Sequence, residues 1–208
     1  MKSRITLRRF IWSVVAISLI GLGAAFNASA RLGNGTVGVF YDGMRCVMGF
    51  APEKLGTSAN IVNVVLIIAL FFIGRRYINI GTILYIAQYG AFVSVGTYLY
   101  SLIFASDAMI IRIIASIIGS LILFAGIAIY VVADIGVDPT TAVVLVIRDK
   151  LKCEYKYAKW LSDALFIVIG GICGGKIGAV TIANLALSGP IIQWMIKKAQ
   201  VLVEEPAK

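Results

Sequence analysis

Long apolar runs alternate with short polar stretches along the whole chain. Four of these runs approach or exceed the roughly 20 apolar residues that cross a hydrocarbon core: Phe10–Ala28, Ile61–Gly74, Ile80–Ile103 and Ile113–Ala133. Two more apolar runs follow, one from Leu161 to Ile172 and one between Lys176 and Lys197. The pattern predicts an all-α fold, a polytopic membrane helix bundle with about six transmembrane helices.

Two polar segments are too short to cross a bilayer comfortably. Gly35–Phe50 carries Asp42 and Arg45, and Asp138–Lys150 is little more than half a span long. Irregular or half-length segments are tolerated at membrane depth only where they pack against protein or line a cavity. We therefore expect two short half-helices that enter the bundle without crossing it.

An internal repeat relates the two halves of the chain. At one constant offset, Gly23, Ala25, Ala30 and Gly33 match Gly126, Ala128, Ala133 and Gly136. At a second offset, Ile73, Ile78, Thr82, Ile83, Ala87 and Gly90 match Ile172, Ile177, Thr181, Ile182, Ala186 and Gly189. The repeats cover about residues 10–103 and 110–198. Three spans in each would place them in opposite orientation, an arrangement common in secondary transporters.

The composition leaves no room for a separate soluble domain. Of the 208 residues, 60% are hydrophobic and only 14% are charged, so residues 1–208 are expected to form one membrane domain in a lipid bilayer. The first apolar run also resembles a signal peptide, with Ala28-Ser29-Ala30 as a cleavage site. Because that run is long and recurs inside the chain, we expect it to be retained as a helix.

The basic residues indicate which side of the membrane each loop faces. With six spans and an inside N-terminus, fourteen of the 19 Lys and Arg residues fall on the inner side: Lys2, Arg4, Arg8, Arg9, Arg75, Arg76, Arg148, Lys150, Lys152, Lys156, Lys159, Lys197, Lys198 and Lys208. Only Arg31, Arg45, Lys54, Arg112 and Lys176 fall outside. An eight-span topology gives nearly the same bias. We prefer six spans because the two extra segments are short and polar, and both termini are then cytoplasmic.

Two motifs resemble a known family. The turn ARLGNGTVGVFYDGM resembles the lGxGxxxxxxDG region of the YczE/YyaS/YitT group of bacterial integral membrane proteins, and GGKIGAVTIANLALSGPIIQWM resembles that group's GxxiGxGTxxxaxxxGPxIq ending. The resemblance covers most of the chain. It is closer to the YczE-like branch, because the chain stops soon after its last helix, without a soluble C-terminal domain. The resemblance implies a location in the bacterial plasma membrane and an architecture, but no molecular activity.

Ionisable residues in apolar segments cost about 2.5–3.5 kcal/mol each and are therefore the first binding-site candidates. Asp163 would be a cation or proton site if it faced a cavity. Alternatively, it is solvated at the inner interface beside Lys156 and Lys159. Asp42 and Arg45, three residues apart on one helix face, are placed to pair.

Asp138 precedes Pro139 and is expected to cap a helix that begins with that proline. A half-helix N-terminus aimed into the bundle could also hold an anion, so Asp138 could serve both roles. Thr82, Thr181 and Asn184 complete the set of substrate-binding candidates. Thr82 and Thr181 occupy equivalent places in the two repeats, each eight residues before a glycine.

The sequence argues against several other functions. The net charge of +9 is gathered at helix ends, without the basic face of a nucleic-acid-binding domain. The chain has no histidine, and its three cysteines share no close spacing, so we expect no enzyme activity, cofactor or metal site. The leading hypothesis is a small-solute transporter or permease. The alternatives are a substrate-capturing membrane subunit of an ATP-driven importer, with an ATPase partner, and a non-transporting scaffold or regulator. A homo-oligomer is compatible with each.

Overall fold

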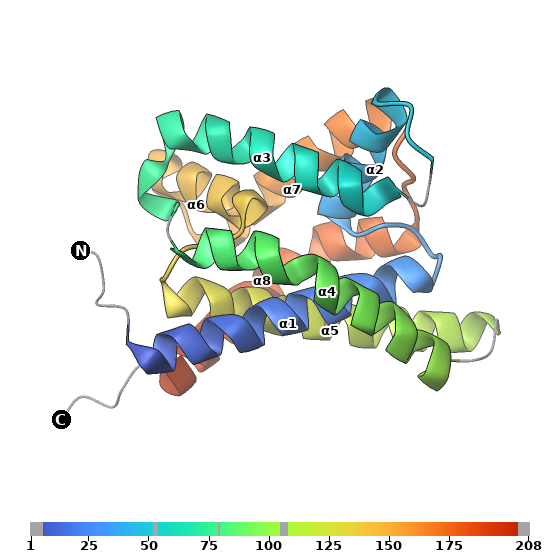
Figure 1. Ribbon diagram of the computed structural model, residues 1–208, viewed down its shortest axis with the longest axis horizontal. Helices are drawn as coiled ribbons and strands as arrows, with labels where there is room; N and C mark the ends of the chain where they lie inside the picture. The colour runs from blue at the N-terminus through green and yellow to red at the C-terminus, as the bar shows by residue number, and fades with distance from the viewer. Residues whose placement is uncertain (1–5, 52–53, 79, 105–107, 204–208) are drawn as a thin grey trace.

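The computed structural model describes residues 6–51, 54–78, 80–104 and 108–203 (Figure 1). Six long helices are α1 (Leu7–Ser29), α3 (Leu55–Ile73), α4 (Ile80–Ile103), α5 (Met109–Ala133), α7 (Tyr155–Ile172) and α8 (Ala179–Val203). Three short ones are α2 (Thr36–Val47), α6 (Pro139–Leu151) and the 3-10 turn η2 (Arg75–Tyr77). These described residues contain no β-strand, so the all-α prediction is confirmed.

The long helices expose apolar surfaces. Among the described residues, α1, α3, α5 and α8 are long and apolar enough to cross a membrane. Large apolar side chains such as Phe72, Ile172 and Ile182 are exposed on the outside of the bundle, where lipid rather than water would suit them. These features favour the predicted membrane helix bundle, and the number of six spans stays a prediction.

Helices α1 and α5 pack closely against each other and run antiparallel. A Cβ atom added at Gly23 of α1 would lie 2.5 Å from the carbonyl oxygen of Gly119. One added at Gly126 of α5 would lie 2.8 Å from the carbonyl oxygen of Ala16. Glycine at both positions therefore lets the two backbones approach closely. Gly23 and Gly126 are also matched residues of the repeat.

The substitution Gly23→Ala should destabilise the fold by about 1–3 kcal/mol, because the new methyl group overlaps the backbone of α5. Thermal unfolding in detergent micelles measures the change. Gly56→Ala is the matched control, since a Cβ atom there meets nothing within 4 Å. Equal stability of the two variants would contradict close packing at the α1–α5 crossing.

Matched threonines of the two repeats make matched hydrogen bonds. The Thr82 hydroxyl donates to the carbonyl oxygen of Val137 (2.8 Å), and the Thr181 hydroxyl donates to that of Asn34 (2.5 Å). The neighbouring amides, at the starts of α4 and α8, bind in the same way: Gly81 N to Ile135 O (2.9 Å) and Val180 N to Leu32 O (3.2 Å). Each bond ties a long helix of one repeat to the loop that leads into the short helix of the other.

These two loops also share an unusual backbone. Arg31 and Asp134 have φ of 53° and 50°, and each is followed two residues later by a glycine, Gly33 or Gly136, with φ of 108° and 124°. Positive φ angles of this kind favour glycine because a Cβ atom would clash with the backbone. The same turn therefore ends α1 and α5 and redirects the chain into α2 and α6.

Arginine side chains join the ends of the long helices at both ends of the bundle. Arg8 donates to Leu202 O (2.7 Å) and Arg9 to Ala133 O (3.4 Å), so α1 begins where α8 and α5 end. At the other end, Arg112 donates to Ala30 O (2.7 Å), where α5 begins and α1 ends. Lys2, Arg4 and Lys208 were predicted on the basic side and lie outside the described residues.

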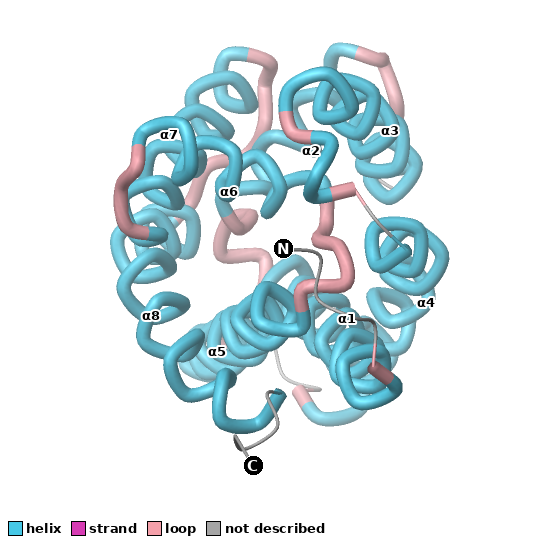
Figure 2. Tube along the Cα trace, turned by 90° about the vertical axis from the view of Figure 1, so that its left-hand side faces the viewer, coloured by secondary structure: helices cyan, strands magenta, loops and turns pink. Residues whose placement is uncertain are grey.

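The short helices occupy the interior at their N-terminal ends. Figure 2 looks along the bundle and shows the long helices around the loops that lead into α2 and α6. From there α2 extends toward one end of the bundle and α6 toward the other (Figure 1). The predicted segments Gly35–Phe50 and Asp138–Lys150 thus form helices of 12 and 13 residues, too short to span a bilayer.

Candidate functional site

An internal cavity of about 340 Å³ lies where the first turns of α2 and α6 meet. Residues 34–38, which include the start of α2, form one wall, and Asp138, Thr140 and Thr141 of α6 form another. Side chains of α1, α3, α4, α5, α7 and α8 complete the lining. The volume is in the range of small-molecule sites, and the lining residues come from both repeats.

The start of α6 is capped by a carboxylate that lines this cavity. Asp138 Oδ2 accepts hydrogen bonds from the backbone N–H of Thr141 (2.8 Å) and from the Thr140 hydroxyl (2.6 Å), and Pro139 takes the first helical position. The predicted cap is confirmed. Asp138 is only 4% exposed, so a carboxylate sits in the interior of an apolar bundle.

The start of α2 is built differently. Its N-cap residue, Gly35, offers no side chain to the free N–H groups of the first turn. The neighbouring Thr36 hydroxyl points instead to Asp163 of α7, to which it donates a hydrogen bond of 2.8 Å. The two short helices are therefore equivalent in place but not in charge, because only α6 carries an acidic cap.

Asp163 is the centre of a buried polar cluster. It is fully buried and accepts hydrogen bonds from the Thr36 hydroxyl (2.8 Å), the Ser188 hydroxyl (3.0 Å) and the Lys159 ammonium group. The alternative of a solvated Asp163 at the interface is wrong. Asp163 lies directly behind the cavity wall, since its three partners line the cavity.

Lys159 was predicted among the basic residues of the inner face, but its side chain is buried inside the bundle. The side chain is 6% exposed and forms an ion pair with Asp163, one helical turn further along α7. The spacing of four residues places the two side chains on one helix face and could have identified the pair from the sequence. The net charge of the pair is zero.

Amide side chains connect three helices at another part of the cavity wall. Asn27 of α1 donates to the Ser120 hydroxyl of α5 (3.2 Å), which donates to Asn184 of α8 (3.1 Å). Asn27 and Asn184 both line the cavity, so the predicted candidate Asn184 lies at the site. Hydrogen bonds of this type join helices in membranes, and here they also present amide groups to the cavity.

Aromatic rings form much of the remaining wall. Tyr85 and Tyr89 of α4 stack with ring centroids 5.0 Å apart, and Phe166 of α7 stacks on Phe40 at the same separation. Tyr41, Tyr85, Tyr89 and Phe166 all line the cavity. None of these rings was predicted as a site residue, because tyrosine and phenylalanine in a span are indistinguishable from packing residues in the sequence.

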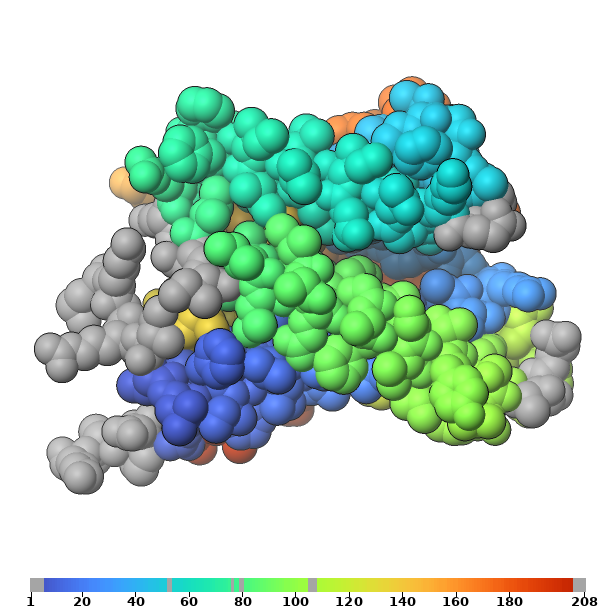
Figure 3. All heavy atoms as spheres, in the orientation of Figure 1, coloured from blue at the N-terminus to red at the C-terminus, as the bar shows by residue number. Residues whose placement is uncertain are grey.

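The cavity opens between α3 and α4. Helix α7 packs along α8, whereas the equivalent helices α3 and α4 make few contacts in the described residues. The lining residues on this side, Gly56 and Asn60 of α3 and Gly90 and Ser94 of α4, are all exposed. Figure 3 shows this face, with a recess between α3 and α4. The cavity is therefore open on this side, whereas the matching side of the other repeat is closed.

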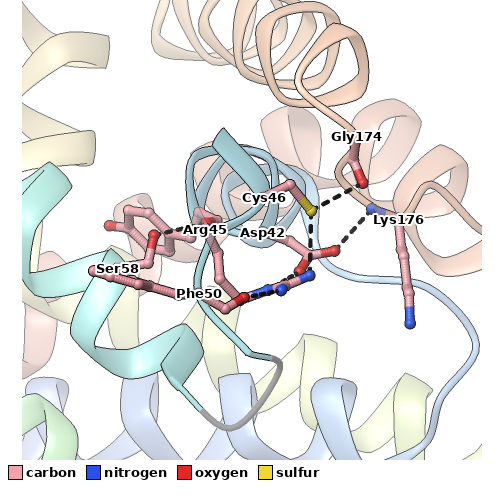
Figure 4. Close-up of polar contacts among 8 residues, drawn as sticks. Asp42, Arg45, Cys46, Phe50, Ser58, Gly174 and Lys176 are labelled. Atoms are coloured by element: carbon pink, nitrogen blue, oxygen red, sulfur yellow. Dashed lines mark hydrogen bonds and ion pairs between the residues drawn. The ribbon is translucent and has the colours of Figure 1, made fainter. Parts of the chain in front are cut away.

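Asp42 lies outside the cavity, in a separate cluster (Figure 4). As predicted, it pairs with Arg45 (2.8 Å), and its second oxygen accepts from the backbone N–H of Lys176 (2.9 Å). Arg45 also donates to the carbonyl oxygen of Phe50 (2.5 Å). These bonds attach α2 to the loop before α8, so Asp42 is a structural residue here. Thr82 and Thr181 likewise lie outside the lining and hold the loops that enter α2 and α6.

An exposed ion pair lies at the start of α7. Glu154 accepts hydrogen bonds from Gln193 (3.0 Å) and from Lys156 (3.0 Å). The Gln193 bond, followed by the Lys156 contacts, lowers the pKa of Glu154. The group is exposed and does not line the cavity, which makes it a suitable control position.

A family model described as a family of unknown function, DUF6198, matches residues 7–197. This match does not support the narrower resemblance to the YczE/YyaS/YitT group. No curated protein and no solved structure matches the chain. The site must therefore be interpreted from its own geometry.

Proposed function

The chain belongs to DUF6198, a family of unknown function, and we propose that it is a multi-pass membrane transporter or permease for a small solute. One observation carries the proposal: the cavity lies where the N-terminal ends of two short, non-spanning helices meet, one from each half of the chain. Transporters built from repeats place their binding sites at such junctions of interrupted helices.

The arrangement of the helices supports an inverted repeat. Equivalent helices α1 and α5 run antiparallel, and equivalent threonines bind equivalent loops. We infer six spans: α1, α3, α4, α5, α7 and α8. The α3–α4 side is open and the α7–α8 side is closed, an asymmetry that an inverted repeat would reverse in its other conformation.

We place the protein in the cell membrane with both termini in the cytoplasm, because basic residues gather at the end where α1 begins and α8 ends. After Cys46, Cys153 and Cys173 are replaced by serine, Arg75→Cys should not react with a membrane-impermeant maleimide in intact cells, whereas Lys54→Cys should react. Both positions are exposed. External labelling of position 75 would contradict the six-span topology.

Proteoliposomes that contain only this chain test the proposed function. We expect saturable uptake of at least one solute from a broad panel of small metabolites, with empty liposomes as the control. Uptake that appears only when an ATPase pair is added would identify a substrate-capturing subunit instead. No uptake of any solute in either arrangement would contradict transport and favour a scaffold or regulator.

A further inference from the structure

Asp138 presents an unpaired carboxylate oxygen to the cavity. Its Oδ2 atom accepts both hydrogen bonds of the cap, while Oδ1 has no hydrogen bond or ion pair with the described residues. Asp138 Oδ1 is not one of the fully buried polar atoms that lack a hydrogen-bond partner, and Asp138 lines the cavity. A ligand in the cavity can therefore reach it.

The charges around the cavity do not balance. Lys159 and Asp138 are the basic and acidic side chains among the described lining residues, and Lys159 forms an ion pair with Asp163 behind it. One negative charge, on Asp138, remains without a cationic partner. A buried carboxylate in this state is costly, and a bound cation would offset the cost through a charge-assisted hydrogen bond.

The surroundings of Asp138 suit an organic cation better than a metal ion. Tyr41, Tyr85 and Tyr89 line the same cavity as Asp138. Aromatic faces attract ammonium groups through cation–π interactions. The described residues contain no group of three acidic, cysteine or histidine side chains that could hold a metal ion. The aliphatic side chains of Ile20, Leu123 and Ile127 also line the cavity, where they would contact the apolar part of a ligand.

We propose that the solute of this cavity is a protonated amine with an apolar body, whose ammonium group binds Asp138 Oδ1. The inference rests on the proposed transport function for its biological meaning, but amine binding can be measured separately. Asp138 thus has two roles, since one carboxylate oxygen caps α6 and the other binds the ligand.

Three probes of nearly equal shape test the proposal in purified wild-type protein: 2-phenylethylammonium, the neutral 2-phenylethanol and the anion phenylacetate. Isothermal titration in detergent micelles should show the ammonium probe binding at least about tenfold more tightly than the other two, because only it gains the charge-assisted bond. Equal or tighter binding of the alcohol or the anion would overturn the proposal, as would no binding of any probe.

The substitution Asp138→Asn separates the two roles. Asparagine caps helices about as well as aspartate, so the fold should be kept while the charge is lost. Binding of 2-phenylethylammonium should fall about tenfold or more, and Glu154→Gln, the same change on the surface, should leave it unaltered. Undiminished binding to Asp138→Asn would overturn the proposal.

Uptake distinguishes this inference from the proposed function. Selective amine binding without uptake of any solute would leave the inference standing and contradict transport. Uptake of neutral or anionic solutes alone would support transport and overturn the inference. Uptake of amines that is lost in Asp138→Asn would support both.

Discussion

Asp163→Asn is expected to cost about 3–5 kcal/mol of folding free energy, because it leaves the Lys159 ammonium group buried without its carboxylate. No other carboxylate contacts Lys159 in the described residues. The unfolding temperature in detergent micelles, followed by the fluorescence of the three tryptophans, measures the loss.

A double variant identifies the cause of that loss. In Lys159→Met/Asp163→Asn no buried charge is left unpaired, and the asparagine can still accept from Thr36 or Ser188, so most of the stability should return. Glu154→Gln, at an exposed ion pair, should change stability little. If Asp163→Asn proves no less stable than Glu154→Gln, the buried pair is not structural. A stable double variant that fails to move solute would show that the charges serve transport.

Gly90→Trp is expected to close the cavity without disturbing the fold. A Cβ atom at Gly90 meets nothing within 4 Å, and the residue lines the opening between α3 and α4. The indole ring would have to be displaced before a ligand could enter, at a cost of about 1–3 kcal/mol, which corresponds to roughly a ten- to hundredfold loss of binding. Isothermal titration with 2-phenylethylammonium and the uptake assay both measure the effect.

Ala87→Trp is the matched control for this substitution. Ala87 lies on the same helix, is exposed and does not line the cavity. Its indole ring should leave binding and uptake close to the wild-type values. Equal losses in the two variants would show that the effect comes from α4 itself rather than from the cavity.

The sequence predicted the elements of this fold better than their number of membrane crossings. The apolar runs located the long helices, and the short polar segments located α2 and α6, because length and hydropathy reflect what a bilayer tolerates. Matching Gly23 with Gly126 and Thr82 with Thr181 anticipated residues that make matched contacts. Whether α4 and α7 cross depends on packing and on the membrane itself, which composition does not describe.

Prediction of the site depended on the kind of residue. Asp138 and Asn184 were found because polar groups are rare in apolar segments, and both line the cavity. Asp42 was chosen on the same ground but makes its bonds to Arg45 and Lys176 elsewhere. Lys159 was missed because it seemed to belong to a basic loop, and the tyrosines because aromatic residues also pack. Which polar residue faces a cavity is decided by tertiary structure, and no local pattern records it.

Accessibility of the cavity from both sides of the membrane tests transport without knowledge of the solute. Ile127, a half-buried residue of α5, lines the cavity and can carry a single cysteine after Cys46, Cys153 and Cys173 are replaced by serine. Leu121, exposed on the same helix and outside the lining, is the control and should stay unlabelled. In sealed vesicles of opposite orientation, we expect a membrane-impermeant maleimide to modify Ile127→Cys from either side. Modification from only one side, or from neither, would contradict a transport function.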